Sequence, residues 1–349
     1  MKEIPGLIDV HVHFRTPGQT HKEDFTTGTS AAVAGGFTTV LDMPNNAIPI
    51  TTTTLLEEKI RLAKKQAICD IGFHFGSLGN NLGQFQKIKK KVFGIKLYLN
   101  ITTGKFIIDE KKLKEIYNRW PKDAGPILVH AEKDVIDIVI SVAKETKKQT
   151  HVCHVSSIYE LKAVIKAKKH NIKITCGVTP HHLFLSPAQA KKLGPYGIMK
   201  PPIEKGYMEF LWKNLKYIDV IESDHAPHTE KEKDGENPPF GVPGLETTLP
   251  LLLTAVHEGR LTMEDIVRLC YENPKKIFRV PDQDARVEID PDEEYVIKNE
   301  DLFTKCGWSP FEGRKMRGRV KRVILRNKVV FENGKIKVKP GFGKVIKPI

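Results

Sequence analysis

The segment Gly-Leu-Ile-Asp-Val-His-Val-His-Phe at residues 6–14 is a short apolar run rich in β-branched residues, and it predicts a buried β-strand. Stretches rich in Ala, Leu, Lys and Glu, such as residues 52–65, 134–147 and 159–169, lie between further runs of this kind and predict helices. Seven such runs follow the first, at residues 38–44, 70–77, 93–100, 126–132, 150–156, 173–180 and 217–224. Strands that alternate with helices indicate parallel βαβ units. Eight units in a row favour an α/β fold with a closed (β/α)8 barrel of the TIM type.

The alternation of strands and helices stops after Phe278. Residues 319–325 and 328–332 alternate between apolar and polar side chains, and the turn dipeptide Asn333-Gly334 follows them. We therefore predict a barrel over residues 1–283 and a small β-rich appendage over residues 284–349 that packs on it. Long Pro- and Gly-rich loops at residues 195–206 and 225–244 flank the eighth strand, and such loops are often functional.

The composition excludes several classes of protein. A chain of 349 residues with 40% hydrophobic residues, 26 Gly and 22 Pro is neither collagen nor a disordered chain. Its five cysteines are odd in number and form no Cys-x-x-Cys pair, which argues against a disulfide framework and favours a reducing compartment. The apolar runs are too short to span a membrane, and the N-terminus has no signal-peptide core. We therefore expect a cytoplasmic protein that makes no contact with a membrane.

The formal net charge of +14 has two explanations. A basic chain can bind nucleic acid or attract an anionic substrate, but lysine-rich surfaces are also enriched in heat-adapted proteins. The lysines are spread over helix-like segments, and the chain has no recognisable nucleic-acid motif. We therefore favour a solvated lysine-rich surface, which can still attract small anions, and expect no nucleic-acid partner.

Residues with metal-binding chemistry recur at the ends of the predicted strands. His11 and His13 are two residues apart, so both imidazoles point to the same face of the first strand. The C-terminal ends of barrel strands form the active site in this class of fold. Each residue alone is better explained by packing or hydrogen bonding, but a packing explanation must account for all of them together. The other members of the set are Lys96, His130, His154 and Asp224.

These residue types suit two divalent ions, because imidazole and carboxylate are zinc-type ligands. The lysine is the exception, since an ammonium group cannot bind a cation. Burial favours the neutral amine, which can capture carbon dioxide to form a carbamate that bridges two cations. A Schiff-base lysine is the alternative, but it does not require the four histidines.

Several longer motifs resemble the dihydroorotase family of the amidohydrolase superfamily. The similarity extends over essentially the whole chain and is strongest to the branch that contains the dihydroorotase domain of the animal multifunctional pyrimidine enzyme. The motifs are PGLIDVHVHFR (5–15), KEDFTTG (22–28), GGFTTVLDMPN (35–45), KLYLN (96–100), HVCHV (151–155), TPHHL (179–183), SDHAPH (223–228), PGLET (243–247) and WSPFEGRKMRG (308–318).

The resemblance implies a role for each matching residue. His11, His13 and Asp224 match the ligands of a first zinc ion, and His130 and His154 match those of a second. Lys96 matches the carbamylated lysine that bridges them, and Asp224 also matches the catalytic base. The residues that match substrate contacts are Arg15 and Asn45 at the carboxylate, His228, Lys200, Thr102 in a loop over the site, and the backbone of Pro243 and Gly244.

Two positions depart from the family pattern. The animal-type branch has an acidic residue where this chain has Gly177, and that acid and the cysteine matching Cys153 support an additional zinc ion. We therefore expect two metals here, with Cys153 as a buried small hydrophobic residue. Lys200 stands where relatives have Arg or Asn, and lysine lacks the planar fork of arginine. His151 matches no ligand, and we expect it to make structural hydrogen bonds.

The resemblance implies reversible cyclisation of N-carbamoyl-L-aspartate to L-dihydroorotate in pyrimidine biosynthesis. A hydantoinase or allantoinase is the nearest alternative, although hydantoins with apolar substituents have no use for Arg15 and Asn45 together. A non-catalytic scaffold with this fold is a more distant alternative, since all six metal-site residues are present. A homodimer and an association with aspartate transcarbamoylase are expectations from the resemblance alone.

Overall fold

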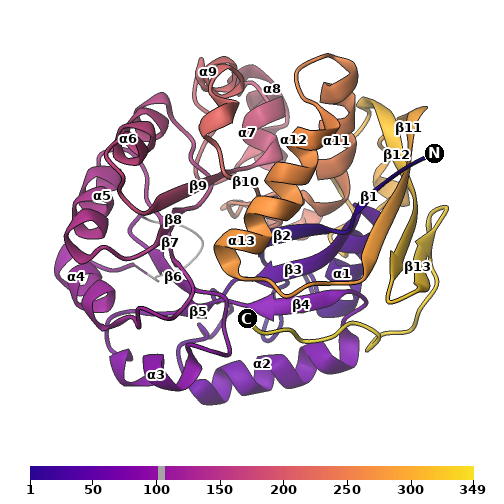
Figure 1. Cartoon of the computed structure of the whole chain (residues 1–349). Coiled ribbons are helices and arrows are strands. Elements are labelled where there is room, and N and C mark those ends of the chain that lie inside the picture. The colour runs from indigo at the N-terminus through magenta and orange to yellow at the C-terminus, as the bar shows by residue number, and fades with distance from the viewer. Residues whose placement is uncertain (101–106) are drawn as a thin grey trace.

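The parallel strands of the chain form a barrel, which confirms the predicted (β/α)8 fold (Figure 1). The computed structural model describes residues 1–100 and 107–349. The strands pair in the orders β2-β3-β4 and β5-β6-β7-β8-β9-β10, and a parallel bridge between Val12 and His225 joins the first strand to the end of the last. β4 and β5 are separated only by His74 and act as one strand. The strands are β2 (Leu7–Val12), β3 (Phe37–Asp42), β4 (Asp70–Phe73), β5 (Phe75–Gly76), β6 (Ile95–Tyr98), β7 (Ile127–His130), β8 (Thr150–Val152), β9 (Ile174–Val178) and β10 (Val220–Ile221).

Helices form a layer around the barrel (Figure 1). Asp24, Thr52 and Ser157 each accept hydrogen bonds from backbone N–H groups of the first turn of the helix that follows, which satisfies donors that the helix itself leaves free. The helices are α1 (Phe25–Ala34), α2 (Thr53–Gln66), α3 (Phe85–Ile88), α4 (Glu110–Arg119), α5 (Val135–Thr146), α6 (Ile158–Lys169), α7 (Pro180–Phe184), α8 (Pro187–Lys192), α9 (Tyr207–Lys213), α10 (Glu230–Lys233), α11 (Leu245–His257), α12 (Met263–Val267) and α13 (Asn273–Phe278).

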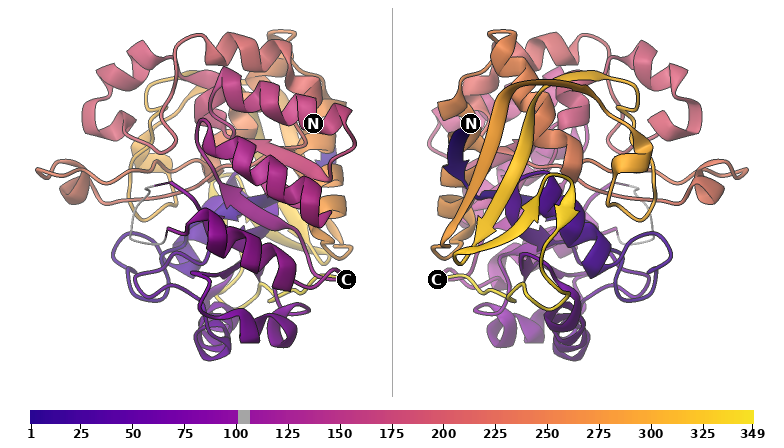
Figure 2. Two further views of the ribbon diagram at one scale, coloured as in Figure 1. Left: turned by 90° about the vertical axis from the view of Figure 1, so that its left-hand side faces the viewer. Right: turned by 90° about the vertical axis from the view of Figure 1, so that its right-hand side faces the viewer.

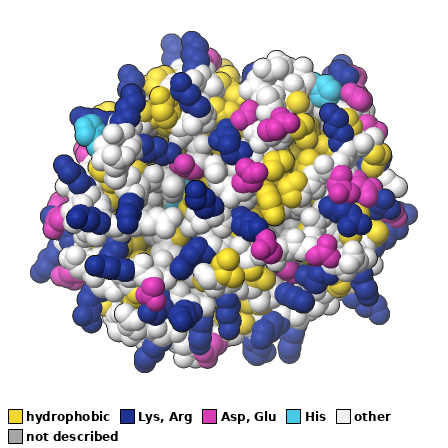
Figure 3. Space-filling view, viewed as in Figure 1, with side chains coloured by type: hydrophobic (Ala, Val, Ile, Leu, Met, Phe, Trp, Pro, Cys, Tyr) yellow, Lys and Arg dark blue, Asp and Glu magenta, His cyan; other side chains and the backbone are white. Residues whose placement is uncertain are grey.

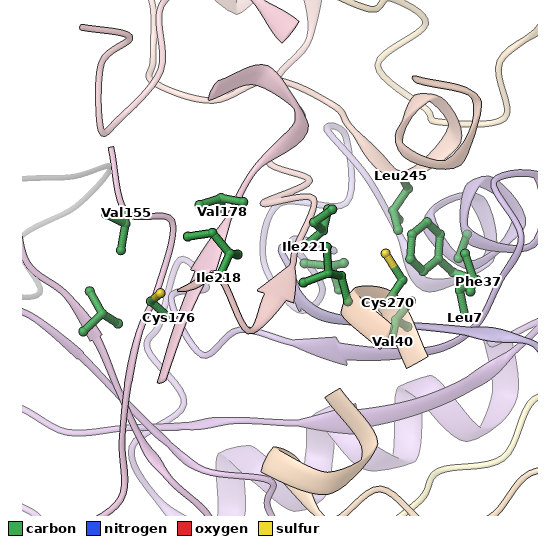
Figure 4. Close-up of a cluster of buried hydrophobic side chains, with 14 of the residues drawn as sticks. Leu7, Phe37, Val40, Val155, Cys176, Val178, Ile218, Ile221, Leu245 and Cys270 are labelled. Carbon is green, nitrogen blue, oxygen red and sulfur yellow. The ribbon is translucent and has the colours of Figure 1, made fainter. Parts of the chain in front are cut away.

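Two apolar layers stabilise the barrel. The outer layer lies between the strands and the helices, and Figure 4 shows part of it, including the register partners Val178 and Ile221 on β9 and β10. The inner layer fills the barrel and includes Val10, Leu128 and Phe278. The ring of Phe278 on α13 lies against two inward-facing imidazoles, with ring centroids 5.9 Å from His74 and 5.2 Å from His151. The interior is therefore packed, and the polar groups that bind ligands are left to the strand ends.

A small antiparallel sheet packs beside the barrel and contains strands from both ends of the chain (Figure 2, right). Its order is β1-β11-β12-β13-β14, so the N-terminal strand pairs with β11 in the region predicted to be an appendage. Asn333 and Gly334 have φ angles of 47° and 75° and form the predicted turn between β13 and β14. The strands are β1 (Lys2–Pro5), β11 (Ala285–Val296), β12 (Lys315–Leu325), β13 (Lys328–Glu332) and β14 (Lys335–Ile336).

The C-terminal segment joins this sheet to the N-terminal ends of the barrel strands. Asp70, at the start of β4, pairs with Arg326 at 2.7 Å and accepts a hydrogen bond from the backbone N–H of Lys344 at 2.8 Å. Val345 forms a parallel bridge with Ile71. The small sheet is therefore tied to the end of the barrel opposite the strand ends that carry the metal-type residues.

Lysine and arginine side chains are spread over the face of the molecule seen in Figure 3, with acidic side chains between them. Within residues 1–100 and 107–349, none of the helices combines the length and apolar character needed to cross a bilayer.

Candidate active site

Four histidines, Lys96 and Asp224 meet at the C-terminal ends of the barrel strands. His11 lies in β2 and His13 directly follows it, so the alternation of a strand brings both imidazoles to the same side. His130 is the last residue of β7, His154 lies two residues after the end of β8, and Asp224 lies three residues after the end of β10. His154 and Asp224 have φ angles of 35° and 45°, which are uncommon for residues with side chains and often occur at functional sites.

Three of these residues form a group that can hold a metal ion. His11 Nε2 and His13 Nε2 lie 3.3 and 3.0 Å from the same oxygen, Oδ1 of Asp224. The ligand atoms of all three residues lie within 4.8 Å of one another, and the residues are buried. Asn45 Oδ1 is 2.7 Å from His13 Nδ1 and fixes that imidazole with Nε2 toward Asp224.

A second pair of imidazoles lies beside the first group. His130 Nδ1 is 3.1 Å from His154 Nε2, and the ring centroids of His154 and His11 are 5.1 Å apart. Glu132 Oε1 contacts His130 Nε2 at 2.9 Å and orients that ring. The analysis of the sequence missed Glu132, although it lies two residues beyond His130, on the same side of the strand end.

Lys96 lies on β6 and is fully buried. Its Nζ has no hydrogen-bond partner among the described residues and lies 5.0 Å from the centroid of the Tyr98 ring. An amine in this position is costly unless a further group satisfies it. The buried Nζ therefore fits a lysine that is modified or that binds a ligand.

Burial affects the pKa values of three histidines and Asp224 in this cluster. It lowers the pKa of His13 to about 3 and holds the pKa values of His130 and His154 below that of a free histidine. Burial also acts to raise the pKa of Asp224, but the neighbouring His11 and His13 outweigh it and hold that pKa below the ordinary value. Neutral imidazoles and an ionised carboxylate are the forms that bind a divalent cation.

A cationic pocket adjoins the cluster. Arg15 is 4% exposed and has a φ angle of 57°, and its Nη2 lies 3.2 Å from His228 Nε2. Its Nε donates a hydrogen bond to the carbonyl oxygen of Pro227 at 3.3 Å. Lys22 Nζ lies 3.2 Å from His228 Nδ1. Burial, followed by the charges of Arg15 and Lys22, holds the pKa of His228 far below its usual range, so this imidazole is neutral between two cations.

A cavity of about 30 Å³ joins the two parts of the site. Eight predicted residues line it, namely His11, His13, Arg15, Asn45, His130, His154, Lys200 and Asp224. The other lining residues are Tyr98, Ala226, Phe240 and Gly241. Lys200 enters this cavity with Nζ 3.7 Å from Glu132 Oε2. A larger cavity, of about 580 Å³, is lined by Trp120 and several lysines and contains none of the predicted site residues.

Two predicted substrate contacts lie in a neighbouring space. Pro243 and Gly244 line this space beside His225, and the backbone N–H of Gly244 donates to His225 Nδ1 at 3.2 Å. Thr102 lies outside the described residues. The structure therefore brings the four histidines, Asp224, Arg15, Asn45 and Lys200 into one cavity. Lys96 and His228 do not line it, and His228 contacts Arg15.

Glu222 is a buried carboxylate that the analysis of the sequence missed. It lies two residues before Asp224, at the end of β10, and this spacing was the available signal. The ligand atoms of His11, Cys153 and Glu222 lie within 4.8 Å of one another. Cys153 belongs to the inner apolar layer, and burial raises the pKa of its thiol to about 12. The metal count of two stays a prediction.

Comparison with known proteins identifies the class. The sequence model of the amidohydrolase family matches residues 4–183, more than half of the chain. The L-hydantoinase from Arthrobacter aurescens has the same fold, with a TM-score of 0.94 and 25% identity over 99% of this chain and 88% of that chain. The protein therefore belongs to the amidohydrolase family.

More similar sequences narrow this assignment to dihydroorotases. Dihydroorotase from Pyrococcus abyssi is 37% identical over 364 residues, which cover 99% of this chain and 87% of that protein. The multifunctional protein CAD of Squalus acanthias is 44% identical over 348 residues, or 99% of this chain, but this chain spans only 16% of that protein. Within the amidohydrolases, the chain is a member of the dihydroorotase family, which confirms the resemblance inferred from the motifs.

One solved relative shows why the site residues matter. The inactive dihydroorotase-like domain of the Chaetomium thermophilum CAD-like multifunctional protein has a TM-score of 0.85 and 26% identity to this chain, and the match covers 99% of both chains. The fold alone therefore does not separate an active enzyme from an inactive domain.

Proposed function

We propose that the protein is a metal-dependent dihydroorotase that interconverts N-carbamoyl-L-aspartate and L-dihydroorotate in de novo pyrimidine biosynthesis. The observation that carries this proposal is the buried guanidinium of Arg15 at the edge of the His and Asp cluster. A buried guanidinium requires an anionic partner, and the carboxylate of dihydroorotate supplies one.

The residues present fit two zinc ions. We assign His11, His13 and Asp224 to one ion and His130 and His154 to the other, with carbamylated Lys96 between them. The unpartnered buried Nζ of Lys96 and the neutral imidazoles support this assignment. When bound, the two ions would lower the pKa of the attacking water and polarise the ring carbonyl.

Asp224 moves the proton in this mechanism. In the hydrolytic direction, its ionised carboxylate takes a proton from the water as the water oxygen attacks the ring carbonyl carbon. The carbon–nitrogen bond of the ring then breaks, and Asp224 returns the proton to the leaving nitrogen. In the synthetic direction, Asp224 takes a proton from the ureido nitrogen as that nitrogen attacks the carbon of the protonated side-chain carboxyl group. Asp224 passes this proton to the hydroxyl oxygen of that group, the carbon–oxygen bond breaks, and water leaves. The low pKa of Asp224 keeps it available as a base near neutral pH.

The carboxylate pocket orients the substrate for ring closure. Arg15 can bind a carboxylate through two parallel hydrogen bonds, and Asn45 adds a neutral amide donor while its oxygen contacts His13. His228 contacts the guanidinium of Arg15, and Lys200 contributes a charge beside Glu132. Fixing the carboxylate at one end and the reacting carbonyl at the other removes part of the entropic barrier to cyclisation.

Two other functions are less well supported. A hydantoinase would share the fold and the metal site, but the buried Arg15 favours a substrate that carries a carboxylate. An inactive dihydroorotase-like domain would not need six metal-site residues, and this chain has all of them.

We also propose the finer features that the resemblance implies. These are a boundary near residue 283, a role for Thr102 above the site, backbone contacts from Pro243 and Gly244, a cytoplasmic location, a homodimer and an association with aspartate transcarbamoylase. The similarity to a multifunctional protein supports the last of these. The five cysteines are all free, which supports a reducing compartment.

Turnover of L-dihydroorotate tests the function. We would follow the absorbance of L-dihydroorotate with protein purified in the presence of zinc and bicarbonate, beside an Asp224→Asn variant. Loss of dihydroorotate with the wild-type protein only, at a matched metal content, is the expected result. No turnover by wild-type protein that contains both metals would contradict the proposal.

A further inference from the structure

We propose that Glu222 is a positioning residue that holds His11 in the orientation needed for metal binding, and that Gly177 is a glycine because it leaves room for this carboxylate. The inference rests on the proposed metal-dependent function and names a residue that the mechanism above does not use.

Glu222 connects two of the strand ends that carry metal-type residues. Its Oε1 accepts a hydrogen bond from the backbone N–H of His154 at 2.6 Å, which fixes the carboxylate at the end of β8. Its Oε2 lies 3.4 Å from His11 Nδ1 and 3.5 Å from His151 Nε2. The side chain is fully buried, so water does not compete for these contacts.

The orientation of His11 requires an acceptor at this place. The Nε2 atom faces Asp224 at 3.3 Å, so Nε2 is the atom that would bind a cation. A neutral imidazole that offers its Nε2 lone pair carries its proton on Nδ1, which must then donate a hydrogen bond. His11 Nδ1 is buried and has no hydrogen-bond partner among the described residues, while Glu222 Oε2 lies a few tenths of an ångström beyond hydrogen-bond length. A small shift of either side chain completes this bond.

His151 Nε2 is also buried without a hydrogen-bond partner among the described residues, but this ring contacts none of the proposed metal ligands through its other nitrogen. Its Nδ1 already contacts Thr175 Oγ1 at 3.0 Å, which gives the imidazole a partner on the adjacent strand. The position of Glu222 between the two rings therefore matters most for His11, whose second nitrogen points into the metal group.

Gly177 makes this arrangement sterically possible. It is the β9 register partner of Val220, and a Cβ atom built on Gly177 would lie 2.4 Å from Glu222 Oε1 and 2.5 Å from Cδ. Contacts this short force one group to move, and Oε1 is held by the backbone of His154. The space beside Gly177 therefore accommodates the Glu222 carboxylate and no further side chain.

The test measures metal affinity directly. Zinc content and competitive titration with a chelator, together with the visible spectrum of the cobalt-substituted protein, would be compared for wild type, Glu222→Gln and Gly177→Ala. Glutamine has the same size as glutamate, but its amide N–H group would face one of the N–H groups whose hydrogen bonds the Glu222 carboxylate accepts. We expect one of the two metals to bind about 10- to 100-fold more weakly in both variants, with an altered cobalt spectrum.

A double-mutant cycle separates positioning from a general loss of stability. If Gly177→Ala acts by displacing the carboxylate, it should have no further effect on metal affinity in a Glu222→Ala background, where the added methyl group has space. Glu160→Gln is a matched control. Glu160 is also a buried carboxylate that accepts backbone hydrogen bonds, but it contacts none of the proposed ligands.

Three results would overturn the inference. These are metal affinity within twofold of wild type in Glu222→Gln, an equally large effect of Glu160→Gln, or a third metal equivalent that is lost in both Glu222→Gln and Cys153→Ser. The last result would make Glu222 a metal ligand with His11 and Cys153. A failure of the proposed function would give a different result: wild-type protein would still bind two metals but would leave dihydroorotate unchanged.

Discussion

Replacing Arg15 by Met isolates the carboxylate pocket from the metal site. Arg15 is almost fully buried and contacts His228 and the carbonyl oxygen of Pro227. Methionine occupies similar space and meets the same backbone strain at a φ angle of 57°. The variant should therefore fold and bind both metals, but it should lose the charged partner of the substrate carboxylate.

The size of the effect follows from burial. Removing one partner of a buried, hydrogen-bonded charge pair costs about 3–4 kcal/mol, which corresponds to about a 10²- to 10³-fold loss in kcat/KM for L-dihydroorotate. Lys22→Met is the control, because it removes a nearby positive charge that pairs with Glu232 at 2.9 Å and reaches His228 only on its far side. We expect that control to lose less than about tenfold, since Lys22 does not line the cavity and its ion-pair partner Glu232 has a side chain that is 29% exposed.

The assay is the initial rate of dihydroorotate loss at several substrate concentrations, with zinc content measured on the same samples. An Arg15→Met enzyme that contains both metals and keeps kcat/KM within about fivefold of wild type would refute the assignment of Arg15 to the carboxylate.

Three further predictions concern stability and the metal site. Lys59 is fully buried and pairs with Asp42 at 2.8 Å, so Lys59→Met should lower the free energy of unfolding in urea by about 3–5 kcal/mol; a loss below about 1 kcal/mol would contradict this. Burial raises the pKa of Glu246 from 4.5 to about 7 in the folded protein. Between these pH values Glu246 is protonated in the native state and ionised in the unfolded state, so its contribution to the free energy of unfolding is lost as the pH rises from about 4.5 through 7. The free energy of unfolding of Glu246→Gln should therefore increase by about 3 kcal/mol relative to that of wild type between pH 4.5 and pH 8. A difference in urea unfolding that stays constant with pH would contradict the shift in pKa. Chelation should abolish turnover and lower the Tm, and zinc with bicarbonate should restore turnover better than zinc in carbon dioxide-free buffer; equal recovery would argue against carbamylated Lys96.

Local sequence patterns are sufficient to predict the residues at the strand ends because barrel geometry is regular, whereas the substrate contacts came from the family resemblance. The spacing of His11 and His13 puts both side chains on one side of a strand, and the ends of parallel barrel strands must meet at the same rim. His130, His154 and Asp224 follow from the same rule, and all of them line one cavity. The turn at Asn333 and Gly334 was predictable for a different local reason, since those residue types favour positive φ angles.

The features that were missed depend on residues far apart in the chain. The pairing of Lys2–Pro5 with β11 joins opposite ends of the sequence, and neither segment carries a local signal for the other. The space beside Gly177 is filled by Glu222 from the neighbouring strand, so the departure at Gly177 could not be understood from that position alone. Cavity walls are also non-local, and for this reason Pro243 and Gly244 could be placed near the site but not on a particular side of His225.

The most direct test of the proposed function compares L-dihydroorotate with dihydrouracil, which has the same ring without the carboxylate. Both would be incubated with the zinc-loaded enzyme under identical conditions, and kcat/KM would be measured for each. A site built around a buried Arg15 should favour dihydroorotate by about 10²-fold or more. Equal turnover of the two rings, or a preference for dihydrouracil, would contradict the account.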